Sequence, residues 1–262
     1  MAISRQKNMD GPRRSIAGLL SSITDDISGY FSLFVPAVFM TGTLLLEATQ
    51  RNFNPISQTI SMLVWYPHGW VQTVLFSLLG ATLFLLAWKL RRTGMPGKKV
   101  KTGYATLLLS GLGFVTIAIF PSGIPGQPYT LVHTIHTWAA IVMTIAAPFS
   151  SLLLAPVFKT GSKYNLAYIL CLVLGITGFV FNIVGLGIII FGFPWIGAVE
   201  RAIMLNGLIW AQLLAWQLYK SQHIKNVVVV KAWYPPVYNA FETRLALALA
   251  RVREFDTRRK TR

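Results

Sequence analysis

The side chains that could carry chemistry in this sequence are few, with eight carboxylates and four histidines among 262 residues. Glu47 and Glu200 are the two carboxylates that lie beside long apolar runs, and His133 and His136 open another such run. A spacing of three places both histidines on one face of a helix. Ionisable groups are costly at the depth of a membrane, so this combination indicates a candidate site.

Histidine and carboxylate side chains are zinc ligands. His133 and His136 would supply a zinc site together with a third ligand, which could be Glu200, Glu47 or His68. A catalytic serine is a second alternative, although neither Ser61 nor Ser122 lies in a Gly-x-Ser-x-Gly turn. No phosphate-loop, dinucleotide or haem-attachment motif occurs, and we predict no cofactor. The same groups could instead be structural, with Arg201 paired to Glu47, and Glu200 paired to Arg51 or to a histidine.

Serines in the first polar connection offer a further structural role, because Ser57 and Ser61 could cap short helices. Two connections and three helix ends therefore place polar groups on one side of the expected bundle. The predicted cluster on this outer side comprises Glu47, Arg51, Ser57, Ser61, Ser122, His133, His136, Glu200 and Arg201.

The elements that must position these groups are long apolar segments. The chain is 54% hydrophobic and 12% charged, whereas a soluble domain carries about 25% charged residues. Each apolar run approaches the roughly 20 residues that a transmembrane helix needs, so we predict an all-α, polytopic membrane protein with a six-helix bundle. The runs are 30–46, 71–88, 104–120, 131–158, 166–191 and 196–218.

The distribution of basic residues predicts the orientation of the bundle. Of the 24 lysines and arginines, 22 lie on the side of the two termini and 2 on the other side. Cytoplasmic loops carry this excess, so both termini are expected in the cytoplasm of a multi-pass cell-membrane protein. Because the net charge of +16 is spread over short blocks between apolar runs, we expect no nucleic-acid partner.

Three regions follow from this pattern: a segment 1–27, a transmembrane domain 28–220 and a basic tail 221–262. Helical apolar stripes in both terminal regions predict amphipathic helices that lie on anionic lipid at the cytoplasmic face. The tail stripe could instead bind a protein partner. Within the domain, the run 166–191 carries glycines and Asn182 on one face, which favours close helix packing.

Four short motifs, in this order, carry a resemblance to a known family. They are Ile60-Ser61, Phe120-Pro121, the histidines His133 and His136, and Gly197-Ala198-Val199-Glu200-Arg201. Between residues 30 and 220 the chain thereby resembles the bacterial and archaeal membrane proteins called domain of unknown function 998. The resemblance implies six spans but no activity. Relatives often carry an acidic residue shortly after Phe-Pro, where this chain has Gly123, which weighs against catalysis.

Three functions remain open at this level. The first is a non-enzymatic membrane component that is lipid-associated or accessory to other proteins. The second is an enzyme acting on a lipid or polyprenyl substrate at the outer interface. The third is a small transporter, although the apolar runs offer no charged group at mid-depth for ion coupling.

Overall fold

Six long α-helices make up most of the computed structural model. It describes residues 16–92, 97–124, 126–158 and 166–233, and the side chains from residue 27 to residue 220 within these ranges. The helices are α1 (Ile16–Thr49), α2 (Trp70–Arg92), α3 (Lys98–Ile119), α4 (Leu131–Leu154), α5 (Leu166–Phe191) and α6 (Ile196–Trp233), with the 3-10 helices η1 (Ile60–Trp65) and η2 (Ala155–Phe158).

The predicted all-α membrane fold is confirmed. Among the described residues, five helices are long and apolar enough to cross a membrane. The sixth, α6, is not one of these five, and its first three turns carry Glu200, Arg201 and Asn206. Each helix overlaps one of the six predicted apolar runs.

The helix bounds differ from the predicted runs mainly at the two ends of the chain. Helix α1 is continuous from Ile16 to Thr49, so residues 16–27 of the predicted N-terminal segment and the first apolar run belong to one helix. Helix α6 continues to Trp233, the last residue that the structure describes, and thus extends beyond the predicted run 196–218. The predicted amphipathic helix in the tail 238–258 lies outside the described residues.

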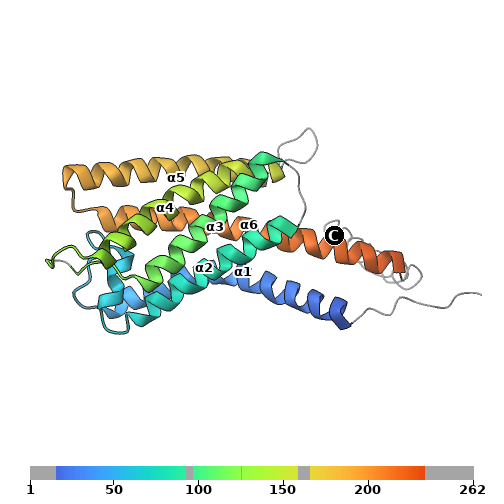
Figure 1. Ribbon diagram of the computed structural model, residues 1–262, viewed down its shortest axis with the longest axis horizontal. Helices are drawn as coiled ribbons and strands as arrows, with labels where there is room; N and C mark the ends of the chain where they lie inside the picture. Colours follow the sequence, from blue (N-terminus) through green and yellow to red (C-terminus); the bar gives the residue numbers. More distant parts are fainter. Residues whose placement is uncertain (1–15, 93–96, 125, 159–165, 234–262) are drawn as a thin grey trace, which may run out of the picture. The chain divides into compact units, whose positions relative to one another are not determined.

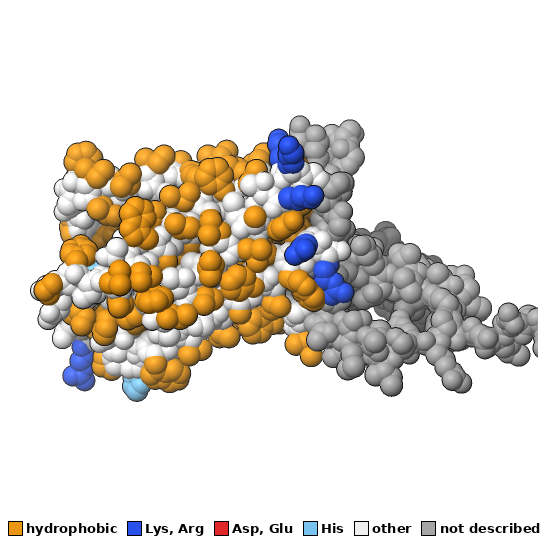
Figure 2. All heavy atoms as spheres, in the orientation of Figure 1, with side chains coloured by type: hydrophobic (Ala, Val, Ile, Leu, Met, Phe, Trp, Pro, Cys, Tyr) orange, Lys and Arg blue, Asp and Glu red, His pale blue; other side chains and the backbone are white. Residues whose placement is uncertain are grey.

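Successive helices from α1 to α5 pack against one another, and they run alternately up and down (Figure 1). The chain divides into two compact units, 1–216 and 217–262, and the bundle belongs to the first. The connections 50–69, 120–130 and 192–195 meet at one end of this unit, here called the η1 end. Lysine and arginine side chains gather at the end opposite to the η1 end (Figure 2). On the face shown, apolar side chains cover the surface between the two ends.

Small residues let α5 approach its neighbours closely, as its sequence predicts. A Cβ atom on Gly175 or Gly178 would lie within 3 Å of side chains of α4 or α6. Asn182 donates hydrogen bonds to the Thr144 carbonyl of α4 at 3.1 Å and to the Gly178 carbonyl at 2.8 Å. These contacts are structural and fix α5 beside α4 and α6.

Candidate functional site

The η1 end contains the predicted polar cluster, and its centre is an ion pair between α1 and α6. The Nη2 atom of Arg201 lies 2.6 Å from Oε1 of Glu47, and Nε lies 3.1 Å from the same oxygen. Both side chains are largely buried, with 15% of the arginine and 10% of the glutamate exposed. The sequence-based expectation that Arg201 would pair with Glu47 is confirmed.

The remaining donors of Arg201 bind backbone carbonyls. Nη1 donates to the carbonyls of Gln58 at 2.9 Å and Gly197 at 2.8 Å. The guanidinium carbon also lies 5.5 Å from the centre of the Phe53 ring, within the range of a cation–π contact. One arginine therefore joins α1, the connection 50–69 and α6, and the charge of each partner is compensated.

Glu200 performs the task of a helix cap. Its Oε2 atom accepts a hydrogen bond from the backbone N–H of Ile60, the first residue of η1. The N-cap residue Thr59 makes no side-chain capping bond, so the carboxylate arrives from a position 140 residues further along the chain. A carboxylate at this place satisfies an unpaired amide and complements the positive end of the helix dipole.

The predicted alternative partners of Glu200 and the predicted serine caps were wrong. Among the described residues, neither Arg51 nor the histidines make an ion pair or hydrogen bond with Glu200. Arg51 is exposed, and Ser57 is half-buried without a side-chain hydrogen bond to the described residues. The reason is geometric, because the start of η1 occupies the position beside Glu200.

Two serines connect η1 to the connection between α3 and α4. Ser122 Oγ donates to the carbonyl of Ser61 at 3.0 Å, and Trp65 Nε1 donates to the carbonyl of Ser122 at 2.7 Å. The Ser61 hydroxyl lies 3.1 Å from that of Thr59. Both predicted nucleophile positions therefore lie in a network of hydroxyl and backbone groups, and within the described part of the chain neither hydroxyl is hydrogen-bonded to a histidine.

The two histidines of α4 face the connection 120–130. Nδ1 of His136 lies 2.7 Å from the carbonyl oxygen of Phe120, and the ring is buried. The ring of His133 stacks on Tyr129 with 4.4 Å between centroids. A Cβ atom on Gly123 would collide with the His133 ring. A glycine therefore suits this place.

The zinc set His133, His136 and Glu200 is not brought together. Within the part of the chain that the structure describes, no three His, Cys, Asp or Glu side chains are placed to hold a metal ion. The histidines contact one connection while the carboxylate contacts another. The zinc hypothesis is thus corrected on geometry.

Three features of this end were missed in the sequence. A Cβ atom on Gly197 would collide with the carbonyl oxygens of Gln58 and Pro55, so the start of α6 lies directly on the backbone of the connection 50–69. The N–H of Ala198 donates to the Ile56 carbonyl at 3.0 Å. Gln58 orders the same connection, since its amide donates to the Tyr66 hydroxyl at 3.0 Å. The sequence motif included Gly197, but it did not reveal what this glycine contacts. The contacts are with backbone atoms, which every residue type has.

We call Glu47, Gln58, Ile60, Gly197, Glu200 and Arg201 the clasp. These residues join the end of α1, the start of η1 and the start of α6 through one ion pair and several bonds to backbone atoms.

An all-helical bundle with apolar spans and a polar clasp at one end defines the chain as a helical integral membrane protein. A family model described as Protein of unknown function (DUF998) matches residues 33–217, and the chain belongs to this family. No curated protein and no solved structure matches it. This match confirms the predicted resemblance to the family. The matched residues contain the whole clasp.

Proposed function

We propose that the protein is a non-enzymatic membrane component, lipid-associated or accessory to other membrane proteins, whose clasp holds the bundle closed at one end. The engagement of Arg201 supports this role most directly. Its guanidinium bonds one carboxylate and two backbone carbonyls, all within the chain. Reaction sites usually keep a charged group free for a substrate, whereas these charges stabilise packing.

The hydroxyl and imidazole groups at the same end support the same proposal. Ser122 and His136 each bond a backbone carbonyl, and the Ser61 hydroxyl bonds that of Thr59. A serine hydrolase requires the nucleophile within hydrogen-bond distance of its base, and this arrangement offers no such pair among the described residues.

We further propose six spans in the cell membrane, with the η1 end outside and both termini in the cytoplasm. The 22-to-2 division of lysine and arginine supports this orientation. Anionic lipid at the cytoplasmic face would then be the first partner, bound by the basic tail, which could alternatively hold a protein.

Cysteine labelling tests the orientation. Gln127→Cys lies in the connection 120–130, and Lys99→Cys lies in the first turn of α3 at the opposite end of the bundle. Both positions are exposed, and the native Cys171 is buried. We expect an impermeant maleimide to label Gln127→Cys in intact cells and Lys99→Cys only after lysis. Labelling of both positions from the same side would contradict six spans with this orientation.

Native mass spectrometry of the full chain in a mild detergent tests the lipid-associated role. We expect anionic phospholipid to remain bound in excess over zwitterionic lipid. Each basic residue at an anionic surface contributes about 1 kcal/mol at low salt. Arg251→Gln together with Arg253→Gln should therefore reduce the retained anionic lipid several-fold. Arg51→Gln, which removes one positive charge outside the tail, serves as the control and should leave the retained lipid unchanged. Retention of neither anionic lipid nor a protein partner would contradict the proposal.

A further inference from the structure

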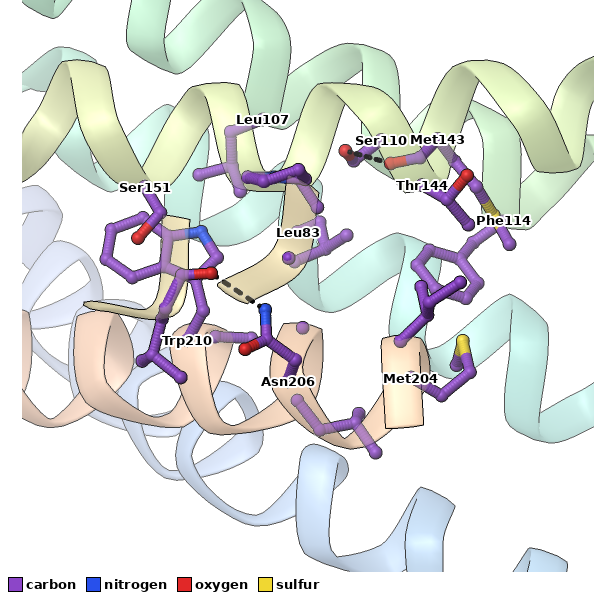
Figure 3. Close-up of a pocket in the computed structure, with 18 of the residues that line it drawn as sticks. Leu83, Leu107, Ser110, Phe114, Met143, Thr144, Ser151, Met204, Asn206 and Trp210 are labelled. Carbon is purple, nitrogen blue, oxygen red and sulfur yellow. Dashed lines mark hydrogen bonds between the residues drawn. The ribbon is translucent and has the colours of Figure 1, made fainter. Parts of the chain in front are cut away.

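A small cavity lies in the middle of the bundle, where α2, α3, α4, α5 and α6 meet (Figure 3). Its volume is about 40 Å³, and one water molecule needs about 10–15 Å³ of such space. The cavity therefore has room for roughly one to three water molecules and is too small for a lipid chain. Apolar side chains form much of the wall, among them Leu83, Phe114, Met143 and Met204.

Trp210 has an unsatisfied donor at this cavity. Its side chain is 2% exposed, and Nε1 has no hydrogen-bond partner among the described residues. Figure 3 shows the nitrogen-bearing edge of the indole turned towards the other lining side chains. A buried N–H without an acceptor is unfavourable, and almost all buried N–H groups in native proteins are satisfied by protein or by ordered water. An acceptor inside the cavity would remove this penalty.

The other polar side chains of the wall offer acceptors. The hydroxyls of Ser110, Thr144 and Ser151 each donate their single proton to a backbone carbonyl at 2.7–3.1 Å. A hydroxyl oxygen has two lone pairs, so each of them can still accept a hydrogen bond. Asn182 and Asn206 donate to backbone carbonyls through nitrogen, and their amide oxygens are further acceptors. The wall thus combines one donor that lacks an acceptor with several acceptors on α3, α4, α5 and α6.

A water molecule matches this arrangement. It can accept a hydrogen bond from Trp210 Nε1 and donate its two protons to oxygen atoms of the wall, which is within the two to four bonds of a buried water. An ion does not match, because no lysine, arginine, histidine, aspartate or glutamate is among the described lining residues, and an uncompensated charge is costly there. Cavities that stay dry are lined by apolar groups, unlike this one.

We propose that this cavity is an internal water site, in which one water molecule is bound between Trp210 Nε1 and side-chain oxygen atoms on α3, α4 and α5. The water joins α6 to these helices in the middle of the bundle, whereas the clasp joins α6 to α1 and η1 at one end. The site goes beyond the function proposed above, since neither the clasp nor lipid binding requires it.

Nuclear Overhauser contacts between protein and water test the site in the full-length protein in detergent. The chain has eight tryptophans, and Trp210→Phe identifies the indole N–H resonance of Trp210 by its loss. We expect this proton to cross-relax with water with opposite signs in NOE and ROE spectra, which is the signature of a long-lived bound water. The methyl groups of Met143 and Met204 should show the same contact, because both side chains line the cavity and are 6% exposed.

Trp70 is the matched control, because its side chain is 67% exposed. Any water at its indole exchanges rapidly and should not give this pattern of signs. A hydroxyl proton of the wall that exchanges with bulk water could imitate the signal, so Ser110→Ala, Thr144→Val and Ser151→Ala are compared with the wild type. The contact should survive each single replacement, because the remaining oxygen atoms still hold the water.

The inference is overturned if neither the Trp210 indole nor the two methionine methyl groups contact a long-lived water, since the cavity would then be dry. It is equally overturned if one of the three hydroxyl replacements abolishes the contact, because the signal would then come from that hydroxyl. If Trp210→Phe does not fold, the methionine methyl groups, assigned with Met143→Leu and Met204→Leu, decide the question.

Discussion

Arg201→Met is expected to lower the unfolding free energy by about 3–5 kcal/mol, because it leaves Glu47 buried without its counter-charge. The carboxylate is 10% exposed and lies 2.6 Å from the arginine that would be lost. The change also removes the bonds to the carbonyls of Gln58 and Gly197. Titration with a denaturing detergent, followed by circular dichroism, measures the difference.

Arg51→Met is the matched control for this prediction. Arg51 follows α1 by two residues at the same end of the bundle, but it is exposed. Surface substitutions of this kind change stability by about 0.5 kcal/mol or less. Equal losses in the two variants would mean that the general charge at this end, and not the ion pair, stabilises the bundle.

The second large effect is expected at Gly197, where a single methyl group would separate α6 from the connection 50–69. Gly197→Ala should lower the unfolding free energy by about 2 kcal/mol, since overpacking typically costs 1–3 kcal/mol. The atoms in the way are the backbone oxygens of Gln58 and Pro55, which cannot rotate aside as a side chain can. The same denaturation measurement reports the loss.

Gly187→Ala provides the comparison within a helix of the same bundle. A Cβ atom there meets nothing within 4 Å, so alanine should leave stability unchanged or raise it by up to about 1 kcal/mol through its helix propensity. If Gly197→Ala were as stable as Gly187→Ala, the close approach of α6 to the connection would be disproved.

The helices were predictable because membrane spans have a strong sequence signal. Long apolar runs and the division of basic residues depend on composition alone, and each predicted run overlaps one helix. A helix in the N-terminal segment was predicted from its apolar stripe, but its unbroken continuation into the first span was not, since Asp25 and Asp26 interrupt the apolar pattern there. Aspartate has a low helix propensity, but propensity is a weak preference, and a helix continues through such residues when its backbone hydrogen bonds are maintained.

The clasp was predictable only in part. Opposite charges near two helix ends indicated the pair of Glu47 and Arg201, which the structure contains. The partner of Glu200 is a backbone N–H, and any residue type would supply it, so residue identities could not reveal it. Among the described residues, the indole nitrogen of Trp210 is buried without a hydrogen-bond partner, and this too could not be read from the sequence, because burial and hydrogen bonding depend on how the helices pack.

The clasp residues of the motif Gly197-Ala198-Val199-Glu200-Arg201 contact parts of the chain that are distant in sequence. Glu47 and Arg201 are 154 residues apart, and Ile60 and Glu200 are 140 apart. Contacts of this kind bring the start of the last helix to the end of the first one. A clasp of this kind would hold a six-helix domain together at the end where η1 lies.

The coupling free energy between Glu47 and Arg201 tests this account most directly. A double-mutant cycle with Glu47→Gln, Arg201→Gln and the combined variant isolates the pair from its surroundings. We expect both single variants to be destabilised and the coupling to be about 1–3 kcal/mol in favour of the native pair. If Glu47 and Arg201 were instead reactive residues held at a cost in stability, replacing either one would raise the unfolding free energy. Single variants as stable as the wild type or more stable, with a coupling near zero, would contradict a structural clasp.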